Sequence, residues 1–229
     1  MRNFFIIIII VAFGIMLYPL FNSFSGNEEL SGLANYYAQK ENVEKVNSAN
    51  LVTAVVVTYR GLDTLGEVTI LFLTAAIIAF FLKKQSETRT LRRNSEVFKT
   101  AAKVLIPIII LVGVYIFING HLSPGGGFQG GAVIASAVIL MLLAFPNMPF
   151  NNKLFGFTES ISGLVFVSLA ALGALLGSGY LDNAILPLGT FGELLSAGAI
   201  PVIYSFVGLK VGSELSNILN EFQSAQSDS

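Results

Sequence analysis

The 229-residue chain contains no cysteine and only one histidine. Without cysteine, it has no disulfide, no iron–sulfur cluster held by its own thiolates and no cysteine-based zinc site. A single histidine excludes a metal centre built from several histidines of this chain. We therefore expect no metal site and no cofactor in this chain. A subunit that carries redox chemistry is the weakest functional hypothesis for it.

Charged residues are also scarce, at 12% of the chain, which is about half the usual fraction in soluble domains. The net charge is −1, and no basic stripe with interleaved aromatic residues is present, so we expect no nucleic-acid partner. Hydrophobic residues make up 54%. A soluble fold of this size cannot bury so much apolar surface, so the composition predicts an all-α integral membrane protein.

Six apolar runs are predicted to be membrane-spanning helices. They cover residues 4–24, 62–82, 104–119, 129–145, 158–178 and 190–210. The first run resembles a secretory signal in position, but it is longer than a signal core and has no clear cleavage site, so we interpret it as a retained helix. The shorter stretch 51–59 is interrupted by Arg60 and Gly61. It is predicted to be an interfacial or re-entrant helix, or an extension of the second span.

The distribution of positive charge predicts the orientation, because cytoplasmic loops carry an excess of Lys and Arg. Residues 83–103 hold seven basic and two acidic side chains. With this range in the cytoplasm, Arg2, Lys153 and Lys210 lie there too, so ten of the 13 basic residues are inside. Both termini are then cytoplasmic. The basic run is interpreted as a topology signal in contact with lipid headgroups, with a docking surface as the alternative.

The same run divides the chain. We expect a two-helix segment at 1–82, a polar linker at 83–94, a four-helix domain at 95–212 and a polar C-terminal tail at 213–229. Asn94 or Ser95 is predicted to cap the third helix.

Acidic residues in membrane helices are rare and usually functional. Asp63 and Glu67 are four residues apart, on one face of the predicted second helix, and Arg60 precedes them on that face. Two carboxylates in a medium of low dielectric repel, so one tends to hold a proton, whereas Arg60 favours their charged forms. The three residues are candidates for binding H⁺ or Na⁺. The alternative is a structural Arg–Asp pair near the outer interface.

Two further acids are weaker candidates for ion translocation. Glu159 and Glu193 fall in the first turns of the predicted fifth and sixth helices, where the helix dipole alone explains an acidic residue. Pro201 is expected to kink the sixth helix.

The loop at 119–131 is rich in glycine and contains His121 and Pro124. Its G-x-G-x-x-G match is rejected as a dinucleotide site because a membrane span, not a strand, precedes it. Irregular backbone at a membrane face must be covered by protein or water, so we expect this loop to be buried against a partner subunit. His121 is a candidate proton relay, with a hydrogen-bonded loop histidine as the alternative.

The run GHLSPGGGFQGG at 120–131 resembles the signature of the B subunit, with its MnhB-type domain, of Mrp multisubunit Na⁺/H⁺ antiporters. The resemblance spans about residues 94–212 and includes GELLSAGAIP at 192–201 and VGLKVG at 207–212. The loop residues that match the family's motif are Pro124, Gly125, Gly126, Gly127 and Phe128, and these are the residues that we expect at the subunit interface.

The run YRGLDTLGEVT at 59–69 is similar to a segment near the C-terminal end of the antiporters' large A subunit. In membrane-bound hydrogenases and related respiratory complexes, a like segment is the separate E subunit. Two usually separate pieces therefore resemble parts of this one chain. In the family, the acidic pair matched by Asp63 and Glu67 is thought to matter for ion passage.

The two resemblances imply a subunit of a Na⁺/H⁺ exchanging complex in a prokaryotic cytoplasmic membrane. Its expected partners are subunits like Mrp A, C, D, E, F and G, and in a redox-driven complex also peripheral hydrogenase or other redox subunits. Two hypotheses stay open at this stage: a subunit whose acids lie on the cation route, and a structural membrane adaptor.

Overall fold

The computed structural model describes residues 2–23, 32–82, 94–146 and 148–225. Every regular element in these ranges is a helix, so the predicted all-helical class is confirmed. The chain divides into two units, Met1–Tyr36 and Tyr37–Ser229. In the first, α1 (Arg2–Ser23) is an apolar helix with Pro19 inside it, and α2 (Gly32–Ala38) begins at the end of the unit. The predicted linker 83–94 lies outside the described residues except for Asn94.

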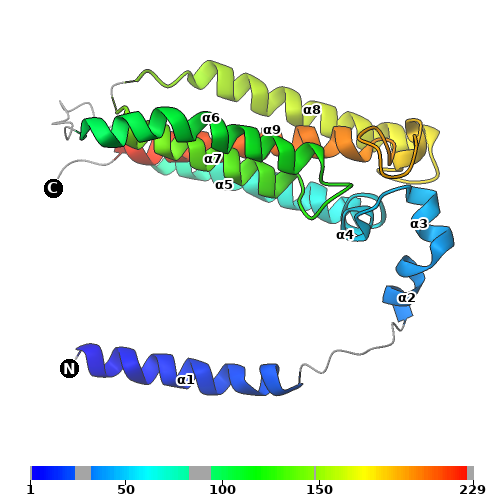
Figure 1. The fold of residues 1–229 in the computed structure, drawn as a ribbon, viewed down its shortest axis with the longest axis horizontal. Coiled ribbons are helices and arrows are strands. Elements are labelled where there is room, and N and C mark those ends of the chain that lie inside the picture. The colour runs from blue at the N-terminus through cyan, green and yellow to red at the C-terminus, as the bar shows by residue number, and fades with distance from the viewer. Residues whose placement is uncertain (1, 24–31, 83–93, 147, 226–229) are drawn as a thin grey trace. The chain divides into compact units, whose positions relative to one another are not determined.

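Five long helices form a bundle in the second unit: α5 (Gly61–Phe81), α6 (Glu96–Ile118), α7 (Gly127–Ala144), α8 (Asn152–Leu176) and α9 (Ile200–Ala225). They lie lengthwise side by side, as Figure 1 shows. Helix α9 contacts each of the other four. Buried residues lie on nearly every side of it between Ile200 and Ser216. It is therefore the central helix of the bundle.

Four of the described helices, α5 to α8, are long and apolar enough to cross a membrane. Central helix α9 is more polar and does not meet that criterion. Helix α1 contains the apolar stretch Ile6–Pro19, which is shorter than the length required of a candidate span. The structure thus supports a membrane protein with four candidate spans, and the count of six stays a prediction.

The predicted sixth helix, 190–210, is wrong at its start and at its end. Residues 190–199 form turns, in which Gly192, Ala197 and Gly198 have left-handed backbone with φ of 85°, 64° and 60°. Helix α9 begins at Ile200 and continues to Ala225, through most of the expected polar tail. Pro201 is its second residue, where a missing N–H costs nothing, so Pro201 starts the helix and does not kink it.

Side-chain caps explain where two other helices begin. Ser95 precedes α6 and accepts a hydrogen bond from the N–H of Phe98 at 3.2 Å, which confirms one of the two predicted caps. The Nδ2 of Asn94 instead donates to the carbonyls of Leu143 and Ala144 at the end of α7, at 2.6 and 3.2 Å. Helix α8 is capped by Asn151 and begins at Asn152, well before the start predicted at residue 158.

The stretch 51–59 is helical and directly precedes α5. Helix α4 (Leu51–Thr53) is capped by Asn50 and continues into η1, a π-helical turn at Ala54–Tyr59. Arg60 separates η1 from α5. The chain turns at Arg60, since the hydroxyl of Thr64 donates to the carbonyl of Val56 at 2.9 Å. The choice between an interfacial or re-entrant helix and an extension of the second span stays a prediction.

Candidate functional site

The predicted acidic face of α5 lies on the surface of the described chain. The Nη2 of Arg60 is 2.6 Å from the Oδ2 of Asp63, and the two side chains are 64% and 53% exposed. The Arg60 Nε also donates to the same oxygen at 2.7 Å. Glu67 is exposed one turn further on. Arg60 therefore balances the charge of Asp63, and Glu67 forms no ion pair with the part of the chain that the structure describes.

A second charged group lies inside the bundle, on α9. The Nζ of Lys210 donates to the Oε1 of Glu214 at 2.8 Å, one helical turn away. Glu214 is 0% exposed, and Lys210 is also buried. The side chain of Lys210 therefore lies inside the bundle, where we had expected a flanking charge in the cytoplasm. Burying two charges costs more desolvation energy than a single contact returns, so this pair is better explained by function than by stability.

Lys210 and Glu214 differ in the number of partners that their charged groups have. The Nζ of Lys210 also lies over the ring of Phe72 on α5, 5.1 Å from its centroid, within the range of a cation–π contact. The second carboxylate oxygen of Glu214, Oε2, is buried and has no hydrogen-bond partner among the described residues. Buried polar atoms nearly always have a partner, so this orphan oxygen indicates a proton, a water or an ion.

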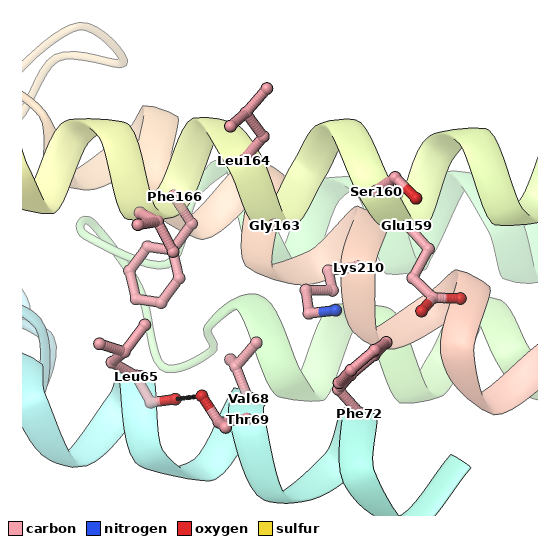
Figure 2. A pocket seen from close by; sticks show the side chains of 11 residues that line it. Leu65, Val68, Thr69, Phe72, Glu159, Ser160, Gly163, Leu164, Phe166 and Lys210 are labelled. Carbon is pink, nitrogen blue, oxygen red and sulfur yellow. Dashed lines mark hydrogen bonds between the residues drawn. The ribbon is translucent and has the colours of Figure 1, made fainter. Parts of the chain in front are cut away.

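Glu159 of α8 belongs to the same cluster. Its Oε2 accepts a hydrogen bond at 3.1 Å from the Nδ2 of Asn217, which lies on α9 one turn beyond Glu214. Figure 2 shows that Glu159 and Lys210 both project from their helices into the space that Phe72 borders from α5. Since α8 begins at Asn152, Glu159 lies beyond the first turn. The helix dipole therefore does not explain it, contrary to the sequence-based interpretation.

Two cavities meet at Glu159. The first, of about 320 Å³, lies between α5, α8 and α9 and is lined mainly by apolar side chains together with Glu159 and Lys210. The second, of about 270 Å³, contains Glu159, Asn152, Asn217 and Glu221 beside three alanines of α5. Helices α5 and α8 each pack on α9, and the cavities fill the space between them.

The polar residues of α9 follow one helical face. Lys210, Glu214, Asn217 and Glu221 are spaced by four, three and four residues, which places them on one side of a helix. Sequence reasoning missed this face because it counted Lys210 as a flanking charge and 213–229 as a tail. The spacing itself was the available signal.

His121 does not join the cluster. It is fully buried in the loop between α6 and α7, and its Nε2 lies 3.3 Å from the carbonyl oxygen of Glu193. Burial lowers the pKa of His121, and backbone hydrogen bonds only partly oppose this effect. The Glu193 side chain is exposed in the turn region. Its other ring nitrogen, Nδ1, is buried and has no hydrogen-bond partner among the described residues. The loop histidine and the proton relay therefore both stay predictions.

Part of the glycine-rich loop is covered by the chain itself, and contact of its exposed part with a partner subunit stays a prediction. Gly126 has φ of 157°, and Gly126 and Gly127 are buried. A Cβ at Gly127 would meet Val207 of α9 at 2.7 Å. The remaining loop residues differ in exposure: Pro124 is exposed, Gly125 is half-buried and Phe128 packs against the core.

Asparagine and threonine side chains fasten the segment before α5 to this loop. The Nδ2 of Asn50 donates to the carbonyls of Gly120 and Ser123, each at 2.9 Å. The hydroxyl of Thr53 donates to Gly120 at 2.6 Å and accepts from the hydroxyl of Tyr204 at 3.3 Å. We call Asn50, Thr53 and Gly120 the clasp. It joins the two sequence segments at one end of the bundle.

The arrangement can hold a cation or a proton, and no other chemistry is evident in the part of the chain that the structure describes. Two carboxylates, Glu159 and Glu214, face one amine, Lys210, so the cluster is formally one positive charge short. Within the described residues, no group of three or more His, Cys, Asp or Glu side chains is arranged to hold a metal ion.

Two family models match the chain. One is described as a domain related to the MnhB subunit of Na⁺/H⁺ antiporters and covers residues 97–217. The other describes the E subunit of MBH and covers residues 1–101. The chain is also 33% identical to the B subunit of the Na⁺/H⁺ antiporter of Alkalihalophilus pseudofirmus, over 57% of this chain and 94% of that protein.

Longer relatives match both segments together. An uncharacterized protein of Methanocaldococcus jannaschii is 33% identical over 73% of this chain and 74% of its own length. A chain in the structure of the membrane-bound sulfane sulfur reductase, an archaeal respiratory membrane complex, superposes with a TM-score of 0.79 at 38% identity. That match covers 96% of this chain and 97% of the other.

Proposed function

This chain belongs to the family of the MnhB subunit of Na⁺/H⁺ antiporters, and we propose that its intramembrane carboxylates take part in moving cations or protons across the membrane. The chain is a subunit of a multisubunit membrane complex. Within that complex we assign the transport role to Glu159, Glu214 and Lys210, with Glu67 on the surface of α5 as a second point on the route.

The buried charges of α9 are the observation that carries this proposal. A helix surrounded by four others gains stability most easily from apolar side chains, and replacing a buried ion pair with apolar residues is often stabilising. Lys210 and Glu214 are nevertheless buried there, and Lys210 lines a cavity together with Glu159. Because α9 packs against the four candidate spans, we place these groups at membrane depth, where ionisable groups usually mark an ion or proton path.

The competing function is that of a structural adaptor. The clasp favours it, because its short hydrogen bonds join two segments that match separate family models. The exposed pair of Arg60 and Asp63 fits this function too, since its charges balance without an ion.

Ion exchange by the assembled complex in membrane vesicles distinguishes the two functions. We expect Glu159→Gln and Glu67→Gln each to lower Na⁺-dependent proton exchange by at least about tenfold, because a relay group that cannot ionise interrupts the transfer. The matched control is Glu96→Gln, which removes an exposed carboxylate paired only with Lys99. Full exchange by both variants in an intact complex would establish the adaptor instead.

We further propose that the parent complex is driven by a redox reaction in another subunit. The sulfane sulfur reductase and the match to an MBH component support a respiratory complex of this kind, and a hydrogenase and another reductase are both compatible with this chain. Affinity purification of the tagged protein tests the point. Co-purifying iron–sulfur or nickel proteins would support it, whereas antiporter subunits alone would indicate a complex without a redox arm.

A further inference from the structure

We infer that the cluster of Lys210, Glu214 and Glu159 stores one exchangeable proton, which Glu159 takes up from the cavity that also holds Glu221. The inference rests on the proposed function and adds to it the identity of the ion that this subunit carries: a proton and not Na⁺. Four observations lead to it, namely the charge balance, the orphan oxygen, the position of Glu159 and the donor set.

The charge balance comes first. Helix α7, which packs closely on α9, has no titratable side chain. The titratable side chains of the other elements that contact α9 are Asp63 and Glu67 on α5, Tyr59 on η1, Glu96, Lys99, Lys103 and Tyr115 on α6, and Lys153 on α8. The pocket next to Lys210 contains none of these eight. Among the described residues, Lys210 is therefore the one cation of this pocket, and we infer that a mobile ion balances the second carboxylate.

The orphan oxygen shows where that charge is needed. Glu214 is 0% exposed, and Lys210 satisfies only its Oε1. Its Oε2 has no described partner. A buried carboxylate with one oxygen that accepts no hydrogen bond raises the free energy of the fold, because its charge has lost its hydration and only part of that loss is compensated. A proton bound to one of the two carboxylates, Glu214 or Glu159, lowers this cost, because acids that share one cation titrate as a coupled set.

The position of Glu159 supplies the route of entry. It lines both cavities, and its present partner, the Asn217 amide, lies on the side of the second cavity. Glu221 lines that cavity as well and is only partly buried. A proton arriving there binds a carboxylate oxygen of Glu159 and forms one O–H bond. Release of the same proton into the first cavity restores the carboxylate, so the cycle needs no other reactant.

The donor set argues against Na⁺. The ammonium group of Lys210 lies 2.8 Å from the Oε1 of Glu214 and lines the first cavity, so it repels a second cation at short range. The hydroxyl groups nearest along α9, those of Ser213 and Ser216, donate to carbonyls of their own helix. The first cavity also contains the hydroxyls of Thr69 and Ser160, and both donate to carbonyls of their own helices. Beside them, Glu159 supplies the one carboxylate of a lining that is otherwise mainly apolar, a poor replacement for the hydration shell of a metal ion.

Chemical labelling of the intact complex in vesicles tests the inference. Dicyclohexylcarbodiimide reacts with protonated carboxyl groups in apolar surroundings, and mass spectrometry locates the adduct. We expect labelling at Glu159 or Glu214 that decreases as the pH rises and does not change when Na⁺ replaces K⁺ at constant ionic strength. Protection by Na⁺ at fixed pH would overturn the proton assignment. Labelling that is as high at exposed Glu96 as in the cluster would overturn the site.

Lys210 provides a second measurement. Lys210→Met removes the amine of the cluster, so we expect the pH midpoint of labelling to move up by about one unit or more. Lys210→Arg keeps the charge and should leave the midpoint near that of the natural protein. An unchanged midpoint in Lys210→Met would show that the amine and the carboxylates are not coupled, against the inference.

An infrared pH-jump experiment covers the possibility that the reagent does not reach Glu214. The carbonyl band of a protonated carboxylic acid should appear on acidification and be lost in Glu159→Gln together with Glu214→Gln. A band that survives in the double variant contradicts the inference. None of these signals depends on ion flux. Normal ion exchange by Glu159→Gln would reject the proposed function but not the storage of a proton. Protection of the carboxylates by Na⁺ would reject proton storage but not the proposed function.

Discussion

At the scale of single residues, the structure assigns different roles to groups that look equivalent in the sequence. Asp63, Glu67, Glu159 and Glu193 are all acids within or beside apolar runs. Only Glu159 is brought to other buried charges, because α9 presents Lys210 and Glu214 to it. Spacing along one helix could predict that Asp63 and Glu67 share a face. Contact between α8 and α9 depends on packing between residues far apart in the chain, which no local pattern contains.

His121 allows a prediction at the same scale. Its folded-state pKa is lowered by burial, so the unfolded chain binds more protons, and the stabilising contribution is present above the ordinary pKa of about 6.5 and is lost as the pH falls below it. We expect the thermal stability of the purified complex to decrease from pH 7 to pH 5, and less steeply in His121→Asn. Equal slopes for the two proteins would rule out His121 as the cause. Since this chain has no other histidine, the difference isolates one group.

At the scale of helices, the errors of sequence-based prediction have one physical cause. Hydropathy measures how well a helix tolerates lipid, but α9 is surrounded by protein. Its polar second half therefore resembles a tail in the sequence, and the apolar turns at 190–199 resemble a helix. Helices α5 and α6, of which little is buried inside the described chain, were located well. Their sequence pattern reflects their actual surroundings.

Close packing of α7 on α9 also depends on individual glycines. A Cβ at Gly131 would meet the carbonyl oxygen of Gly208 at 2.7 Å and the Cβ of Val211 at 2.8 Å, whereas one at Gly156 of α8 would meet nothing within 4 Å. We expect Gly131→Ala to destabilise the subunit by about 1–3 kcal/mol through overpacking. Gly156→Ala should be neutral or slightly stabilising, because alanine favours the helix. Thermal dissociation of the solubilised complex measures both, and equal behaviour of the two variants would contradict the close approach.

At the scale of the whole molecule, the motifs predicted the family better than the hydrophobic pattern predicted the architecture. The matches over residues 1–101 and 97–217 support the resemblance of two segments in one chain. What the motifs could not supply is how the segments meet. The clasp joins them through Asn50 and Thr53, and neither side chain is distinctive in a sequence. The packing of the glycine-rich loop on α9 could not be predicted, because the start of α9 was misplaced.

The orientation in the membrane remains a prediction that the whole fold makes testable. Helices α6, α7 and α8 separate residue 86 from residue 190, so three spans place these positions on opposite sides. Burial of Lys210 removes one charge from the cytoplasmic count, but the seven basic residues at 83–103 still outweigh the three at positions 40, 45 and 60.

Because the chain has no cysteine, Ser86→Cys and Thr190→Cys each introduce a unique label site. An impermeant maleimide should label Ser86→Cys only from the cytoplasmic side and Thr190→Cys only from outside. Exchanged sides would overturn the charge argument but keep the three spans, whereas labelling of both from one side would contradict the bundle itself.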